Sequence, residues 1–254
     1  MINVVLSFLA SLAMPFARLL VYIFFGVAAA YIWLTEFLRL DKLPEPIKMI
    51  LKIFFLGVLT TVPVFLAEYG LAYVVSSANM PLIFAKVLYW FLAIAFVEEF
   101  FKYFVVKAIV LKSPEFDEPV DCMIYMITSA MGFAALENIL YLLPPAGKIF
   151  SFNQTIINSA SIGFFRFIGA TFLHALCSAL VGYFLALSLY KNRGIFMVSG
   201  LSIAVFLHGL YNFSIMDLDS PLKIAIPTVI LLGLAVFVII VFKKIKKLKS
   251  VCII

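Results

Sequence analysis

The chain has 254 residues, of which 65% are hydrophobic and 13% are charged, and its mean hydropathy is +1.18. Soluble domains are about half apolar and a quarter charged, so the composition excludes a soluble domain and predicts a polytopic membrane protein. The net charge of +6 does not indicate nucleic-acid binding, because five lysines lie in one C-terminal stretch, KKIKKLK. Such a basic tail is typical of a segment that faces anionic lipid, so we expect membrane lipids as partners and no nucleic acid.

Seven apolar segments are long enough to cross a bilayer, at roughly 20 residues or more each. They are residues 12–34, 53–75, 82–111, 122–143, 161–190, 195–216 and 222–242. Connectors rich in proline, glycine and charge separate them, and no internal repeat or soluble domain is visible. The sequence therefore predicts an all-α fold: a polytopic membrane helix bundle of about seven transmembrane helices, forming one integral membrane domain over residues 1–254.

The distribution of positive charge predicts the orientation of this bundle. Connectors one-two, three-four and five-six, counted with the flanking ends of their segments, carry Arg39, Lys42, Lys48, Lys52, Lys112, Lys191 and Arg193. Cytoplasmic connectors carry such an excess of lysine and arginine, and the basic tail follows the same rule. We therefore expect a multi-pass protein of the cell membrane with its N-terminus outside and its C-terminus in the cytoplasm.

Ionisable residues within these segments are few, and such residues are costly in lipid and usually mark function. The third segment holds the motif EEFFK, which contains Glu98, Glu99 and Lys102. Later segments add Glu137, Asn138, Arg166, His174 and His208, and these two histidines are the only ones in the chain. Residues four apart share a helix face, which pairs Glu98 with Lys102, His174 with Ser178, and His208 with Asn212.

The depth of these groups can be estimated by counting inward from the cytoplasmic ends at about 1.5 Å per residue. This count places Glu98, Glu137, His174 and His208 roughly 21–26 Å from those ends. Because the hydrocarbon core is about 30 Å thick, one membrane layer could contain all four. Arg166 counts out nearer the external surface, and Lys102 nearer the cytoplasm.

The chemistry of this layer suits hydrolysis of an amide. Two carboxylates in a low-dielectric pocket cannot both ionise cheaply, so one can act as an acid while the other takes a proton from water. A neutral histidine can donate to an oxyanion, and Asn212 could do the same or orient a bound carbonyl.

The same residues also match a catalytic zinc ligand set, with Glu99, His174 and His208 as the ligands. The helical HExxH signature is absent, so these ligands would come from separate helices. The three cysteines have no paired spacing and indicate neither a disulfide framework nor a Cys-based zinc site. The residues alone favour glutamate catalysis without a metal, with zinc as the alternative.

Rival interpretations use the same residues differently. A proton-coupled transporter would also need buried glutamate and histidine, although the chain lacks the paired repeats typical of transporters. A non-catalytic scaffold could keep the polar layer for partner binding. Locally, Glu98 and Lys102 could form a structural ion pair, and Arg166 fits an interfacial or supporting role better than a catalytic one. The abundant phenylalanines are interpreted as lipid-facing.

Four motifs in order resemble the PrsW family of intramembrane proteases. They are EEFFK at 98–102, GFAALENILY at 132–141, RFIGATFLHALCSALVGY at 166–183 and HGLYN at 208–212, within a family-like core at 82–216. The resemblance implies that Glu98, Glu99 and His174 are catalytic and that Glu137, Asn138, His208 and Asn212 complete the site. Taken with the common depth of the buried groups, we expect the catalytic residues to be Glu98, Glu99, His174 and His208. The expected supporting residues are Lys102, Glu137, Asn138, Arg166, Ser178 and Asn212.

The family is also similar to the broader CAAX-protease group, from which this sequence departs. Lys102 stands three residues after the second glutamate, where that group has an arginine four residues after it. Phe133 is followed by Glu137, where that group has histidine. The departures favour the PrsW branch over prenyl-protein processing. The resemblance implies cleavage of a single-span membrane protein near its outer membrane boundary, for example a membrane-bound anti-sigma factor.

Overall fold

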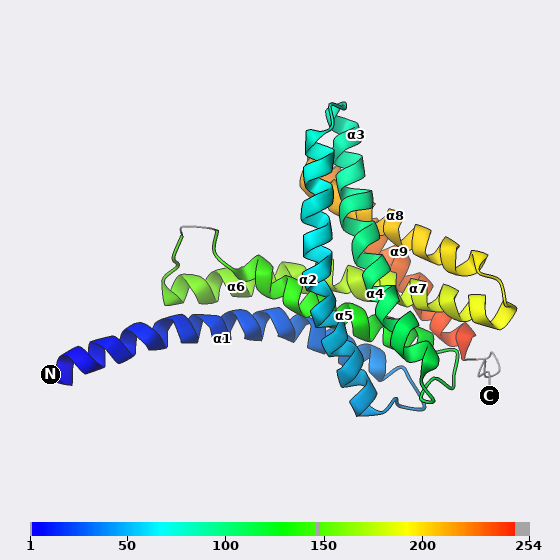
Figure 1. Cartoon of the computed structure of the whole chain (residues 1–254), viewed down its shortest axis with the longest axis horizontal. Coiled ribbons are helices and arrows are strands. Elements are labelled where there is room, and N and C mark those ends of the chain that lie inside the picture. Colours follow the sequence, from blue (N-terminus) through cyan, green and yellow to red (C-terminus); the bar gives the residue numbers. More distant parts are fainter. Residues whose placement is uncertain (1, 146–147, 247–254) are drawn as a thin grey trace.

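The computed structural model describes residues 2–145 and 148–246, with side chains from residue 15 onward, and the described chain is helical with short connectors (Figure 1). The α-helices are α1 (Ile2–Leu38), α2 (Ile47–Ser77), α3 (Leu82–Val87), α4 (Val97–Ile109), α5 (Asp121–Leu142), α6 (Phe152–Arg166), α7 (Phe172–Lys191), α8 (Ile195–Asp217) and α9 (Leu222–Ile245). Two π-helical segments, η1 (Leu88–Phe96) and η3 (Phe167–Thr171), and one 3₁₀ segment, η2 (Val110–Lys112), extend them. The last part of the basic tail, residues 247–249, lies outside the described residues.

Within the described chain, six helical runs are long and apolar enough to cross a membrane. They are Pro15–Leu38, Ile47–Ser77, Asp121–Leu142, Phe152–Lys191, Ile195–Asp217 and Leu222–Ile245. The prediction of an all-α polytopic membrane protein is therefore confirmed. The remaining predicted segment, 82–111, is a continuous helical run from Leu82 to Lys112. It is not among the six, because ionisable residues such as Glu98, Glu99 and Lys102 interrupt its apolar sequence.

The longest helical run in the described chain exceeds every span predicted from the sequence. Phe152–Lys191 comprises 40 residues, which corresponds to about 60 Å of helix. The hydrocarbon core is only about 30 Å thick. The run must therefore tilt strongly or extend beyond the lipid, and the predicted segment 161–190 captures only its later part.

Helix α5 is the centre of the molecule. It packs against α1, α2 and α7, and 78% of its apolar stretch is buried, compared with 28% for α8 and α9. Its contact with α2 is made backbone to backbone, because Gly57 lies on the carbonyl of Ser129 and Gly132 lies on the carbonyl of Phe54. Neither position has room for a Cβ atom, so small residues bring these two helices together.

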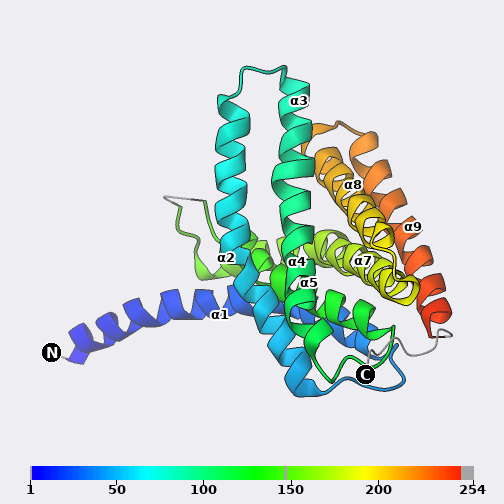
Figure 2. The same ribbon diagram turned by 45° about the vertical axis from the view of Figure 1, so that its right-hand side comes forward.

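The helices leave this centre in different directions (Figure 1). Helix α2 and the run α3–η1–α4 form an antiparallel hairpin that points away from the outer parts of α1 and α6 (Figures 1 and 2). At the tip of this hairpin, α3 is joined to the end of α8 by an ion pair of 2.6 Å between Lys86 Nζ and Asp217 Oδ1. At the other side, connectors 39–46 and 113–120 meet the end of α9 around a cavity of about 480 Å³.

The two π-helical segments lie directly before the functional motifs. Segment η1 leads into the first turn of α4, and η3 leads into the first turn of α7. The wide turn of η3 exposes a backbone carbonyl to a side chain from another helix, since Trp33 Nε1 donates to the oxygen of Phe167 at 2.8 Å. A side chain from α1 therefore holds the entry to the helix that carries His174.

Candidate active site

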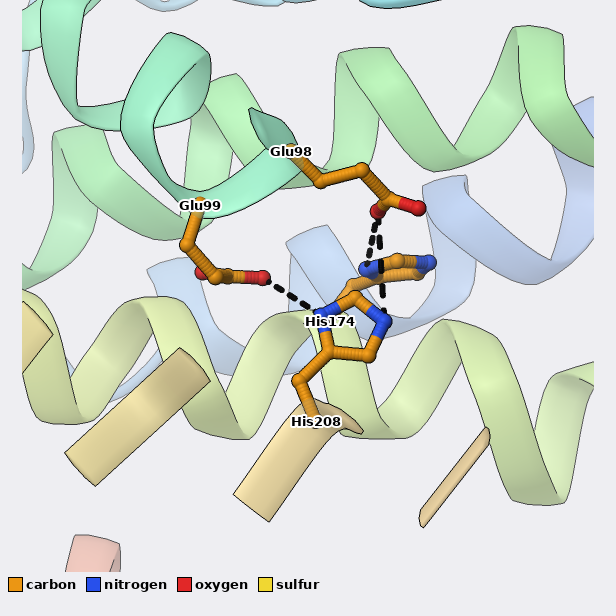
Figure 3. Close-up of side chains that lie close together, drawn as sticks. All are labelled: Glu98, Glu99, His174 and His208. Carbon is orange, nitrogen blue, oxygen red and sulfur yellow. Dashed lines mark hydrogen bonds and ion pairs between the residues drawn. The ribbon is translucent and has the colours of Figure 1, made fainter. Parts of the chain in front are cut away.

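Four ionisable side chains from three helices meet inside the protein (Figure 3). Glu98 and Glu99 come from the first turn of α4, His174 from α7 and His208 from α8. Each offers one ligand atom, and these atoms lie within 4.8 Å of one another. All four residues are at most 3% exposed. The structure thus brings together the four residues expected to be catalytic.

The ammonium group of Lys102 lies among these side chains. Its Nζ donates to Glu98 Oε2 at 3.1 Å and to Glu99 Oε1 at 2.9 Å. It also lies 2.8 Å from His174 Nδ1 and 4.6 Å from the centre of the Phe133 ring. Counting along the helix placed Lys102 nearer the cytoplasm, but helical side chains lean toward the N-terminus, so its long stem reaches back to the glutamates.

The hydrogen bonds assign donor and acceptor roles to the ring nitrogens. An ammonium group only donates, so His174 Nδ1 accepts from Lys102, and His174 Nε2–H donates to Glu137 Oε2 at 2.9 Å. His208 Nδ1–H donates to Glu99 Oε1 at 2.9 Å. The other nitrogen of His208, Nε2, lies 3.9 Å from Glu98 Oε2.

A second set of polar side chains supports His174 at its other ring nitrogen, Nε2. Arg166 Nη2 donates to Glu137 Oε2 at 2.7 Å, and Arg166 Nε donates to Asn138 Oδ1 at 2.5 Å. The amide of Asn138 in turn donates to Thr171 Oγ1 at 3.1 Å and to the carbonyl of Gly26. Arg166 therefore fixes the carboxylate that orients His174, which fits the expected supporting role.

Two of the expected supporting residues stand apart from this network. Ser178 is fully buried one turn after His174, and its hydroxyl has no hydrogen-bond partner among the described residues. Asn212 is partly buried, and no hydrogen bond joins it to the described part of the cluster. Helical spacing predicted the shared face correctly, but it does not determine how far a short side chain reaches.

Comparison with known proteins identifies the family of this chain. The model of the PrsW family intramembrane metalloprotease matches residues 45–242. Protease PrsW of Oceanobacillus iheyensis is 32% identical over 211 residues, which cover 82% of this chain and 88% of that protein. Protease PrsW of Geobacillus kaustophilus is 31% identical over 191 residues, covering 74% and 76%, and that of Bacillus subtilis is 28% identical over 211 residues, covering 82% and 88%. The chain belongs to the PrsW family. No solved structure matches it.

Membership of the PrsW family decides between the rival functions. The chain is an intramembrane protease and a multi-pass membrane protein, as the sequence motifs indicated, and not a transporter. Its substrate is therefore a protein. A buried cluster of glutamates and histidines is present in the described part of the chain.

The family description as a metalloprotease raises the question of whether these residues suit a metal. Two imidazoles and two carboxylates are a donor set that zinc prefers. Among the described residues, Glu99 Oε2 is buried without a hydrogen-bond partner, which leaves it available to a metal. The Lys102 ammonium occupies His174 Nδ1, so it would have to move before that nitrogen could bind a metal. The cluster therefore fits a zinc ion in donor type.

Two residues of this PrsW-family site were missed in the sequence. Phe133 is only 2% exposed and contacts both Lys102 and the ring of His174, so the interpretation of the phenylalanines as lipid-facing is wrong for this one. Thr171 lies three residues before His174 and holds Asn138. Their positions gave a signal, since Phe133 is four residues before Glu137 and Thr171 shares a face with His174.

Proposed function

We propose that this chain hydrolyses a peptide bond of a single-span membrane protein, near the outer boundary of the membrane, using the Glu98/Glu99/His174/His208 site. Membership of the PrsW family gives the class of reaction. The observation that carries the site assignment is the convergence of four nearly inaccessible ligand atoms from three helices. Burying so much charge in lipid is costly, and its concentration at one place is typical of a functional site. A membrane-bound anti-sigma factor, or a similar regulator, is the substrate class we favour.

Within this proposal, Glu98 is the general base. Its carboxylate is the less constrained of the two, because Glu99 Oε1 accepts hydrogen bonds from both Lys102 and His208. Glu98 takes a proton from water and passes it to the leaving amine of the scissile bond. The ammonium of Lys102 lies where it can stabilise negative charge that develops on the carbonyl oxygen.

Glu99, His174 and His208 are the residues that would hold a zinc ion. A bound zinc ion supplies Lewis-acid polarisation of the carbonyl and a more acidic water. Glu137 orients His174, and Arg166 and Asn138 fix Glu137 in turn, as the outer partners of metal-ligating histidines commonly do.

We further propose that residues 1–254 form one protease domain with its core at 82–216, crossing the membrane seven times with the N-terminus outside. The run from Leu82 to Lys112, third in chain order, is the span added to the six apolar runs. It carries the glutamates of the site. Two contacts support this alternation: connectors 39–46 and 113–120 meet at one end of the molecule, and Lys86 meets Asp217 at the other.

Cleavage of a tagged single-span reporter by the purified protein in liposomes tests the site assignment. We expect Glu99→Gln and His174→Ala each to lower the cleavage rate at least about 100-fold. Glu36→Gln, which changes an exposed acidic residue paired with Arg39, should leave the rate unchanged. Full cleavage by both Glu99→Gln and His174→Ala would remove the site assignment.

Elemental analysis of the same preparation tests the metal. We expect one zinc per chain, loss of cleavage on chelation, and loss of zinc in His208→Ala. Cleavage by a chelated, zinc-free protein would instead assign the reaction to the glutamates alone.

A further inference from the structure

A second group of acidic side chains lies at the other end of α5 from Glu137. Asp41 and Glu45 come from connector 39–46, and Asp121 is the first residue of α5. One carboxylate oxygen from each lies within 4.8 Å of those of the other two. These residues share no side chain with the Glu/His cluster, and the proposed hydrolysis does not use them.

Two of these carboxylates are buried with one oxygen each left unpartnered. Asp41 is 8% exposed and Asp121 is 1% exposed. Within residues 2–145 and 148–246, Asp41 Oδ2 and Asp121 Oδ1 have no hydrogen-bond partner. The remaining oxygens are fixed by backbone, because Asp41 Oδ1 accepts from the amide of Leu43 at 3.2 Å and Asp121 Oδ2 accepts from two amides of connector 113–120. The backbone therefore orients these carboxylates while leaving an oxygen of each without a donor.

No lysine or arginine in the described part of the chain forms an ion pair with any of the three carboxylates. The nearby Lys246 donates to the carbonyl of Leu40 instead. Glu45 Oε2 accepts from the hydroxyl of Tyr125, which is a neutral donor. Buried carboxylates without a cationic partner are unfavourable, so a cation at this place would remove a large desolvation cost.

We propose that Asp41, Glu45 and Asp121 bind a hard divalent cation, Ca²⁺ or Mg²⁺. Three carboxylates and no nitrogen or sulfur donor form the ligand type that these ions prefer. Ca²⁺–oxygen distances of about 2.4 Å place ligands on opposite sides of the ion about 4.8 Å apart, and Mg²⁺ needs about 4.2 Å. The adjacent cavity of about 480 Å³, which Asp41 helps to line, provides access and room for water ligands.

The cation would tie connector 39–46 to the first turn of α5. Helix α5 runs from Asp121 to Leu142 and also carries Glu137 and Asn138. Cation binding at the start of α5 would therefore stabilise the helix whose other end positions Glu137 and Asn138 beside His174.

Terbium luminescence tests the proposal directly, with Tb³⁺ as the probe for a hard-cation site and Tyr125 as the neighbouring sensitiser. The native full-length chain is used, and the Asp41 and Asp121 variants described below separate emission at this site from Tb³⁺ bound at the Glu/His cluster. We expect saturable, tyrosine-sensitised emission that Ca²⁺ or Mg²⁺ displaces, and the more effective of the two identifies the ion. Tyr125→Phe should remove most of the emission but keep the stabilisation by the displacing ion.

Matched variants decide the outcome. Asp121→Asn and Asp41→Asn should each weaken Tb³⁺ binding at least tenfold, whereas Glu36→Gln should not change it. After chelation, adding back the displacing ion should raise the Tm of the parent protein by roughly 5 °C or more at saturation and that of Asp41→Asn by much less. Asp41 lies in a connector, so Asp41→Asn keeps the test valid should Asp121→Asn fail to fold. Undiminished emission in both variants, or no displacement by either ion, overturns the proposal.

Discussion

At the scale of single residues, Lys102 balances the charge of the active site. It is fully buried and contacts Glu98, Glu99 and His174 at 2.8–3.1 Å. Removing one partner of a buried ion pair leaves the other charge uncompensated, which costs more than the pair contributes when intact. A substitution of Lys102 should therefore lower the stability of the folded protein as well as its catalytic rate.

We expect Lys102→Met to lower the free energy of unfolding by about 3–5 kcal/mol, because methionine fills a similar volume but leaves two buried carboxylates without their cation. Thermal unfolding in one detergent measures the change as a loss of Tm. Lys107→Met is the matched control, since Lys107 is exposed on the same helix. Equal Tm values for the two variants would mean that the ammonium does not stabilise the cluster.

Arg166 acts through geometry as well as charge. Its guanidinium binds Glu137 and Asn138 at once through two different nitrogens, and the single nitrogen of a lysine cannot reproduce this fixed planar geometry. We expect Arg166→Lys to lower kcat about tenfold with little change in KM, because Glu137 would then hold His174 less firmly. Steady-state cleavage kinetics measure this, with exposed Arg193→Lys as the control. An increase in KM at constant kcat would instead place Arg166 in substrate binding.

At the scale of helices, the packing of α5 on α2 depends on the absence of side chains. We expect Gly132→Ala to destabilise the protein by about 1–3 kcal/mol or more, because its Cβ would meet the backbone carbonyl of Phe54, which cannot rotate away. Gly70→Ala, also within a helix, has no atom within 4 Å of its new Cβ and should be neutral or slightly stabilising. Tm values of the two variants in the same detergent test this. Equal losses would show that helix propensity, and not the close contact, matters at Gly132.

The helices themselves were largely predictable, since long apolar segments and charged connectors mark spans plainly. The predicted starts and ends of the last two segments agree with α8 and α9 within three residues. The start of α6 was missed because Phe152–Ile162 is more polar than a span, although the capping box of Ser151 and Gln154 is a sequence signal for a helix that begins there. The π-helical segments also left no periodic signal, because they depend on contacts such as Trp33 with Phe167.

At the scale of the whole molecule, the meeting of Glu98, His174 and His208 was predictable from the sequence. The positions of Lys102 and Arg166 around them were not. Equal depths along separate helices indicated that Glu98, His174 and His208 could meet, because membrane spans share one frame of reference. The placement of Lys102 and Arg166 depends on the reach of long side chains, which counting along a helix does not give. Asp41 and Asp121 looked like ordinary connector residues, because 80 positions separate them in the sequence.

The proposed seven-span topology gives a prediction for the two ends of the run from Leu82 to Lys112. In a variant with the native cysteines replaced by serine, Asn79→Cys should react with an impermeant maleimide from outside the cell. Glu115→Cys should react only after the membrane is permeabilised, because a spanning helix separates the two exposed positions. Labelling of both positions from the same side would show that this run does not cross the membrane.

The π-helical segment η3 separates Arg166 from His174, and it makes their relative direction sensitive to the length of the chain. Each residue turns an α-helix by about 100°, so losing one residue between them would swing the guanidinium to a different side of the helix while the imidazole stayed in place. A related protease that lacks one residue between these two positions would therefore need a group other than this arginine to orient its histidine. The number of residues in η3 therefore fixes the side of the helix from which Arg166 reaches Glu137.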